Sequence, residues 1–90
     1  MDIHQYKIML VDDNRDLAEM IAGIFRQSGY ENIVTAGSVA EALEVFQRER
    51  PDMAVLDVML PDGDGFRLFQ KLREKSQIPI LFLSAKDEDR

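Results

Sequence analysis

Polar side chains suited to a metal or phosphoryl site follow three of the chain's apolar runs. Asp12 and Asp13 come directly after the first run, Asp57 after a central one, and Ser84 after the last. Short apolar runs bounded by turn residues are typical of buried strands in a parallel sheet. Open sheets of this kind place their ligand sites at the carboxyl ends of the strands. The spacing therefore predicts that these four side chains meet at one edge of a sheet.

The three carboxylates would form an acidic, oxygen-lined pocket. Carboxylates that lie so close together raise one another's pKa unless a cation neutralises their charge. An all-oxygen site with few protein ligands and room for water suits Mg²⁺ rather than Zn²⁺. A metal beside a carboxylate also suits phosphoryl chemistry, because the cation offsets charge on the nucleophile and on the incoming phosphoryl oxygens. The Ser84 hydroxyl could donate a hydrogen bond to one such oxygen.

Each polar group also has a purely structural explanation. Asp12 and Asp13 could cap a helix, where the helix dipole favours negative charge. Asp57 taken alone is equally consistent with a residue that ends a strand and starts a turn. Ser84 is also consistent with an ordinary hydroxyl at a strand end. The run DGDG at residues 62–65 resembles a calcium loop, but the full spacing of that motif is absent and the run is typical of a turn.

The elements that must position these groups alternate along the chain. Four strands are predicted, at Lys7–Val11, Ile33–Ala36, Met53–Leu56 and Ile80–Leu83. The helices between them are predicted from apolar residues at helical spacing. The first helix begins at Asp13 or Asn14 and ends at Ser28-Gly29. Its expected inner face consists of Leu17, Met20, Ile21, Ile24 and Phe25.

The second and third helices are predicted in the same way. Ser38 with Glu41 forms a capping box that opens the second helix, and Pro51 ends it. Its expected inner face consists of Val39, Ala42, Leu43 and Phe46. The third helix is expected to turn these residues inward: Phe66, Phe69 and Leu72, with Leu68 as an additional candidate. Residues 86–90 are predicted to start a further helix.

Alternating strands and helices define the fold class. The order βαβαβαβ requires parallel strands joined by right-handed crossovers, with helices on both faces. We expect an α/β fold with a flavodoxin-like, doubly wound parallel sheet in the order 2-1-3-4. Strands one and three are then neighbours at the topological switch point. No linker, repeat or low-complexity segment interrupts residues 1–90, so one domain is expected.

Composition narrows the function classes. The 90 residues carry a net charge of −6, which argues against nucleic-acid binding by this surface. They contain no cysteine, which excludes disulfides and thiolate metal sites. No apolar run reaches the roughly 18 residues of a membrane span, and the first residues lack the pattern of a signal peptide. Neither of the two glycine-rich motifs that bind nucleotides is present. A cytoplasmic protein without membrane contact is expected.

Three stretches carry a resemblance to a known family: V-D-D after the first strand, L-D-V-M-L-P-D-G-D-G around Asp57, and L-S-A-K after the last strand. Together they resemble the receiver domain of two-component response regulators over essentially the whole chain. The resemblance implies that Asp57 is the phosphoacceptor for a sensor histidine kinase and a ligand of Mg²⁺. Pro61 and Gly65 match the family's turn after the acceptor. The implied protein is a signalling domain that catalyses only its own phosphorylation and dephosphorylation.

The same resemblance implies roles for five further residues. Asp12 and Asp13 match the family's acidic pair, with Asp13 as a direct Mg²⁺ ligand and Asp12 acting more often through water. The backbone carbonyl of Met59 is expected to bind the metal as well. Ser84 matches the hydroxyl residue that moves toward the phosphoryl group on activation. The Ala85 amide is expected to contact the same group.

The sequence also departs from the family pattern. The family closes its site with a lysine on a fifth strand, and no residue here matches it, since Lys86 directly follows the fourth strand. We therefore expect residues 1–90 to form a partial receiver domain with impaired phosphorylation. Its last strand, at residues 80–83, would be an exposed apolar edge that favours dimers or larger association. The phrase I-L-F-L-S-A-K-D-E is similar to regulators with a winged-helix domain, so DNA contact is expected only through such an output domain.

Two other function classes remain open from the sequence. A receiver-like interaction module that is no longer phosphorylated would keep the fold, although the intact Asp57 and its acidic partners argue against it. A Mg²⁺-dependent aspartyl-phosphate hydrolase would also use a strand-end aspartate. That family carries a D-x-D pattern at the first strand, whereas the nucleophile candidate here follows the third strand. The sequence does not identify the kinase, the output domain or the target genes.

Overall fold

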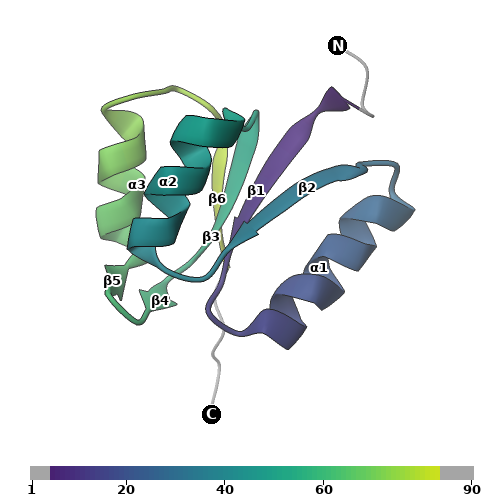
Figure 1. Cartoon of the computed structure of the whole chain (residues 1–90), viewed down its shortest axis with the longest axis horizontal. Helices are drawn as coiled ribbons and strands as arrows, with labels where there is room; N and C mark the ends of the chain where they lie inside the picture. Colours follow the sequence, from purple (N-terminus) through teal and green to yellow (C-terminus); the bar gives the residue numbers. More distant parts are fainter. Residues whose placement is uncertain (1–4, 84–90) are drawn as a thin grey trace.

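Residues 5–83 are described by the computed structural model, which shows a parallel sheet between helices (Figure 1). The strands of this sheet are β1 (Lys7–Val11), β2 (Asn32–Ala36), β3 (Met53–Asp57) and β6 (Ile80–Leu83). The helices are α1 (Arg15–Gln27), α2 (Val39–Glu49) and α3 (Gly65–Arg73). Two short strands, β4 (Met59–Leu60) and β5 (Gly63–Asp64), lie between β3 and α3. The helix start predicted at residues 86–90 lies outside the described residues.

The strand order of the sheet is β2-β1-β3-β6, and every neighbouring pair is parallel. The predicted order 2-1-3-4 is therefore confirmed, with β6 as the fourth strand of the sheet. α2 and α3 cover one face, and α1 covers the other (Figure 1). Crossovers on both faces make the fold a doubly wound α/β fold, as predicted.

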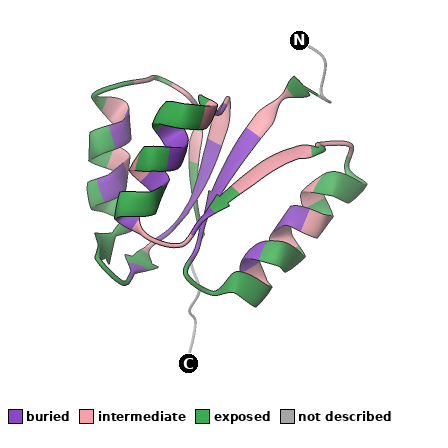
Figure 2. Cartoon of the chain, in the orientation of Figure 1, coloured by how far each residue is buried: buried purple, intermediate pink, exposed green. Residues whose placement is uncertain are grey.

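The sheet has an apolar core on each face. Successive side chains of a strand point to opposite faces. Ala54 and Leu56 of β3 therefore join the core under α2 and α3, while Val55 between them joins the core under α1. Figure 2 shows buried residues along the strands and on the inner sides of the helices. The two cores hold the strands in one register, and this register decides which polar residues meet beyond the strand ends.

The inner face of α1 differs in part from the prediction, because Ile21 and Phe25 pack against the core as expected and two other residues do not. Ala18 and Ala22 are buried, whereas Met20 and Ile24 are 58% and 57% exposed. The apolar arc of the helix is wider than its contact with the sheet, and the contact forms along the side that carries the two alanines. Phe25 packs at the border of this contact. Helical spacing shows which residues share a face, whereas packing decides which part of that face is covered.

The inner face of α3 differs from the prediction at Phe66 alone, since Phe69 also packs against the core as expected. Leu68 and Leu72 are fully buried, one helical turn apart, whereas Phe66 is 55% exposed. Residues two positions apart lie on roughly opposite sides of a helix, so Phe66 cannot share the buried stripe of Leu68. The centre of its ring instead lies 4.9 Å from that of Phe82 on β6.

β6 is the edge strand of the described sheet. It pairs with β3, and within residues 5–83 no strand pairs with its other side. Leu81 and Phe82 are 54% and 37% exposed, so this edge carries exposed apolar side chains. None of the helices within residues 5–83 has the length and apolar character needed to cross a membrane.

Candidate functional site

Asp12, Asp13 and Asp57 meet at the carboxyl ends of β1 and β3. One carboxylate oxygen from each residue lies within 4.8 Å of the other two, a spacing at which the three could hold one metal ion. Asp12 and Asp57 are buried, with 5% and 7% of their surface exposed, and Asp13 is exposed. The structure thus brings together the three carboxylates that were selected from the strand ends.

Strand register places these residues. Val11 of β1 pairs with Leu56 of β3, so the residues that follow them, Asp12 and Asp57, lie side by side. The Asp12 amide also donates to the carbonyl of Ala36 at the end of β2, 3.0 Å away. A slip of one residue in either strand would send its side chains to the opposite face of the sheet and separate the carboxylates.

The Asp12 carboxylate is only partly satisfied by the protein. Its Oδ1 accepts a hydrogen bond from the Asn14 amide at 2.9 Å, while its buried Oδ2 has no partner within the described residues. Burial raises the pKa of Asp12; the Asn14 hydrogen bond opposes the rise, and the charges of Asp57 and Asp13 add to it. A bound cation would stabilise a buried carboxylate oxygen in this position. The residues present therefore fit a divalent cation that prefers oxygen ligands.

Met59 belongs to the site through its backbone. It begins β4 two residues after Asp57, and its amide lies 3.4 Å from Asp57 Oδ1, to which it donates a hydrogen bond. Its side chain is exposed. The family resemblance implies that the backbone carbonyl of the same residue is a metal ligand. Its place at the start of β4 makes the conformation of this loop part of the site.

The segment after Asp57 is a β-hairpin, whereas the sequence predicts only a turn. β4 and β5 pair antiparallel, and the Gly65 amide that follows donates to the Val58 carbonyl at 2.8 Å. The Asp64 side chain accepts a hydrogen bond from the Arg67 amide at 2.7 Å and so caps α3. The hairpin therefore fixes the path of the chain from Asp57 to the start of α3.

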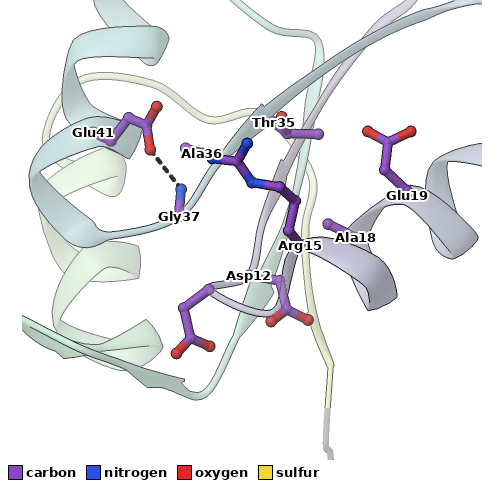
Figure 3. Close-up of a pocket in the computed structure, with 9 residues that line it drawn as sticks. Asp12, Arg15, Ala18, Glu19, Thr35, Ala36, Gly37 and Glu41 are labelled. Atoms are coloured by element: carbon purple, nitrogen blue, oxygen red, sulfur yellow. Dashed lines mark hydrogen bonds between the residues drawn. The ribbon is translucent and has the colours of Figure 1, made fainter.

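A hollow of about 210 Å³ opens beside the acidic cluster on the side of β2. Its charged lining residues are Asp12, Asp13, Arg15, Glu19 and Glu41. Figure 3 shows Arg15 extending from the start of α1 toward the end of β2. The Glu41 carboxylate faces the same space and accepts a hydrogen bond from the Gly37 amide at 2.8 Å (Figure 3). Sequence reasoning identified Glu41 only as a capping residue and did not connect it with the acidic cluster.

Ser84 and Ala85, both selected from the sequence, lie outside the described residues, so their roles stay predictions. The last described residue of β6, Leu83, pairs with Asp57 in the parallel register. The end of β6 is therefore next to the end of β3, which is the strand that carries the central carboxylate.

Asp62 makes a contact that sequence reasoning missed. Its Oδ1 accepts a hydrogen bond from the Val39 amide at 2.7 Å, and its Oδ2 accepts one from the Ala40 amide at 3.0 Å. These amides belong to the first turn of α2 and precede Asp62 by 23 and 22 residues. No local spacing rule connects residues so far apart, so the sequence carries no signal for this contact.

The fold and the acidic cluster together define a class of protein, the receiver-type signalling domain. Residues 8–90 match the response regulator receiver domain family. The chain belongs to this family: it is a receiver domain of two-component response regulators, as the sequence resemblance predicts. Domains of this family are signalling domains that carry their own phosphorylation chemistry and are not conventional enzymes.

Curated relatives include transcriptional regulators from several organisms. The chain is 48% identical over 86 residues to the probable transcriptional regulatory protein TcrX of Mycobacterium tuberculosis, covering 92% of this chain and 36% of that protein. It is 43% identical over 84 residues to the alkaline phosphatase synthesis transcriptional regulatory protein PhoP of Bacillus subtilis, covering 92% and 35%. The chain thus spans about a third of the length of these relatives.

Solved receiver domains have the same fold. The BeF3-activated N-terminal receiver domain of Klebsiella pneumoniae RstA superimposes with a TM-score of 0.83 at 36% identity, covering 92% of this chain and 70% of that one. The non-phosphorylated HemR receiver domain of Leptospira biflexa gives a TM-score of 0.79 at 35% identity, covering 88% and 64%. The fold of the described residues is therefore the one found in both a BeF3-activated and a non-phosphorylated receiver domain.

Proposed function

We propose that Asp57 accepts a phosphoryl group from the phosphohistidine of a sensor histidine kinase. The observation that carries this proposal is the position of Asp57, which is buried at the end of a central strand with oxygens of two further carboxylates within 4.8 Å. A carboxylate oxygen of Asp57 attacks phosphorus in line, while the bond from phosphorus to the imidazole nitrogen breaks. Charge must be neutralised before two anionic groups can react, and the acidic cluster offers ligands for a neutralising cation.

Mg²⁺ is the proposed cation. Asp12, Asp13 and Asp57 would hold it together with the backbone carbonyl of Met59. Bound there, the ion would offset charge on the attacking carboxylate and on the phosphoryl oxygens. Oδ2 of Asp12 is buried and has no hydrogen-bond partner among residues 5–83, which supports this proposal, because an ion or its bound water would satisfy that oxygen.

Ser84 and Ala85 are proposed to contact the phosphoryl group after transfer, Ser84 through its hydroxyl and Ala85 through its amide. The end of β6 beside β3 supports this placement. Movement of Ser84 toward the added charge would then bias a two-state surface, as in other switches that respond to phosphorylation.

The output of the whole protein is proposed from its relatives. TcrX and PhoP are named as transcriptional regulatory proteins, so we propose that this receiver controls transcription through a DNA-binding part outside the 90 residues. The net charge of −6 supports the proposal that the receiver domain does not itself bind DNA. The kinase and the regulator would meet in the cytoplasm.

A polypeptide of residues 1–90 alone is proposed to be a weak phosphoacceptor. It would lack the lysine that the family places on a fifth strand, and with it part of the charge stabilisation in the transition state. Its exposed edge strand, β6, is proposed to pair with a second copy, because Leu81 and Phe82 expose apolar surface there.

Beryllofluoride, an aspartyl-phosphate mimic, tests the proposed site. Amide NMR spectra of the chain would be followed through a titration with Mg²⁺ and then with beryllofluoride. We expect shifts centred on Asp12, Asp57 and Met59, and we expect Asp57→Asn to abolish the response to beryllofluoride while the dispersed spectrum of a folded protein is kept. Labelling by acetyl phosphate, read as an increase in intact mass, should likewise disappear in Asp57→Asn. An unchanged response in this variant would refute the assignment of Asp57.

A further inference from the structure

The Asp62 carboxylate joins two segments that are distant in the sequence. It lies in the turn between β4 and β5, and its two oxygens accept hydrogen bonds from the first two amides of α2, at Val39 and Ala40, at 2.7 and 3.0 Å. The first amides of a helix have no partner within the helix, and the positive end of the helix dipole favours an anion there. These hydrogen bonds hold the pKa of Asp62 below its ordinary value, so the carboxylate is charged at neutral pH.

Helix α2 also has a local cap of its own. The Ser38 hydroxyl accepts a hydrogen bond from the Glu41 amide at 3.1 Å, and the Glu41 carboxylate accepts one from the Gly37 amide. This is a variant of the predicted capping box, because the glutamate reaches the residue before the N-cap. The Ser38 hydroxyl therefore caps α2 by a hydrogen bond within the helix's own first turn, whereas Asp62 connects the helix to the hairpin.

Apolar packing accompanies the same connection. Leu60 of β4 and Val39 of α2 are both buried, at 8% and 7% exposure, and belong to one core cluster. A Cβ at Gly63 would come within 3.2 Å of a methyl group of Val39. The hairpin thus lies closely against Val39 in the first turn of α2 at Gly63, next to Asp62.

The β4–β5 hairpin begins directly beside the acidic cluster. It starts at Met59, whose amide donates to Asp57 and whose carbonyl is a proposed metal ligand. It ends where the Gly65 amide donates to the carbonyl of Val58. Asp62 lies in the turn that joins β4 to β5, and Met59 of β4 pairs with Asp64 of β5. A displacement of this turn would therefore pass through the paired strands to the Met59 carbonyl.

We propose that Asp62 is a positioning residue, which ties the β4–β5 hairpin to the N-terminus of α2 and thereby holds the Met59 carbonyl in place for the metal. This inference rests on the proposed Mg²⁺ site. It predicts that loss of the tie weakens Mg²⁺ binding by more than the loss of stability explains.

Three variants separate positioning from stability. Asp62→Ala removes both hydrogen bonds to α2, and Asp62→Asn keeps one acceptor oxygen. Ser38→Ala is the matched control, because it removes a side-chain cap from the same helix and leaves the hairpin tie intact. Mg²⁺ affinity would be measured by amide NMR titration, and Tm by circular dichroism without metal.

We expect Asp62→Ala to raise the Kd for Mg²⁺ several-fold and Asp62→Asn to raise it less. Ser38→Ala should lower Tm but leave the Kd for Mg²⁺ close to that of the unchanged chain. Equal effects of Asp62→Ala and Ser38→Ala on the Kd, or no effect of either Asp62 variant, would overturn the inference. If Asp62→Ala does not fold, the comparison of Asp62→Asn with Ser38→Ala decides.

A second measurement does not depend on the metal. Hydrogen exchange of the Gly65 amide should be faster in the Asp62 variants than in Ser38→Ala, because only the former release the hairpin. If the Gly65 amide exchanges at the same rate in the Asp62 variants and in Ser38→Ala, then Asp62 does not hold the hairpin against α2. A different result would separate the two proposals. If the unchanged chain does not bind Mg²⁺ but the Gly65 amide exchanges faster in the Asp62 variants, the proposed metal site is refuted, whereas the structural role of Asp62 in holding the hairpin is supported.

Discussion

Gly65 lies directly against the backbone of Asp57. A Cβ on residue 65 would overlap the Asp57 carbonyl oxygen and come within 3.1 Å of its carbonyl carbon. The obstacle is backbone, which cannot rotate away as a side chain could. Gly65 is therefore required by the close approach of two chain segments, and this approach sets the position of the central carboxylate.

Gly65→Ala should consequently destabilise the fold and disturb the site. We expect a loss of about 1–3 kcal/mol in the free energy of unfolding, typical of an overpacked contact, together with weaker Mg²⁺ binding. Gly23→Ala is the control, because its Cβ would meet nothing within 4 Å and it lies within α1. Alanine in a helix interior should stabilise by roughly 0.5–1 kcal/mol. Urea unfolding of both variants measures the contrast, and equal effects would contradict the role of Gly65.

Asp12 should make the metal-free protein less stable as the pH rises. Its pKa is raised in the folded chain, so the folded state holds the proton more tightly than the unfolded state does. Stability from this group is thus greatest below the ordinary pKa of 3.8 and is lost as the pH rises through the higher folded value. Asp12→Asn keeps an acceptor for the Asn14 amide and removes the charge.

We therefore expect Asp12→Asn to melt above the unchanged chain at neutral pH without metal, with a gain of about 4–8 °C in Tm for each kcal/mol recovered. The difference should shrink as the pH falls toward 3.8. Melting curves followed by circular dichroism across this range provide the test. A lower Tm for Asp12→Asn at neutral pH would show that its charge is already compensated in the metal-free protein.

Mg²⁺ should reverse this order of stability. An ion that binds only the folded state stabilises it by about 1.4 kcal/mol when its free concentration is ten times its Kd. The Tm of the unchanged chain should therefore rise with added Mg²⁺, and chelation should remove the gain. Asp12→Asn and Asp57→Asn should show little response in the same melting experiment. A similar gain in both variants would place the binding site elsewhere.

Arg50 offers a stabilising change away from the site. It follows α2 with φ 50° and ψ 62°, a left-handed conformation in which glycine has no Cβ penalty. We expect Arg50→Gly to stabilise by about 0.5–1 kcal/mol in urea unfolding, because the left-handed penalty of roughly 1–2 kcal/mol that it relieves exceeds the entropy cost of glycine. Mg²⁺ affinity should not change, because the variant leaves the acidic cluster untouched. A clear loss of stability would mean that contacts of the arginine side chain outweigh the backbone strain.

The exposed edge strand should govern self-association of the 90-residue polypeptide. Leu81 is 54% exposed on β6, and a charged side chain there opposes pairing between strand edges. We expect Leu81→Lys to shift sedimentation profiles at high concentration toward the monomer. Circular dichroism would serve as the control that the variant stays folded. A monomer in both proteins at every concentration would contradict association through this edge.

The local pattern of the sequence was sufficient for the sheet and for the acidic residues. β1 and β6 have the bounds that the apolar runs predict, and the strand order follows from alternation with helices. Parallel strands end at one edge of the sheet, so Asp12, Asp13 and Asp57 could be selected from their places after the runs. The identity of the family follows from the same residues.

The tertiary structure alone decided how much of each helix is covered and how the loop beside Asp57 is held. Met20 and Phe66 have the spacing of buried residues and are exposed, because burial depends on what packs against a helix and not on its own periodicity. Asp62 reaches amides more than twenty residues earlier in the chain, and the backbone of Asp57 excludes a side chain at Gly65. The contact of Asp62 joins segments that are distant in the sequence and exists only once the fold has brought α2 and the hairpin together. The approach of Gly65 to Asp57 depends on the path of the hairpin between them, which the sequence predicted only as a turn.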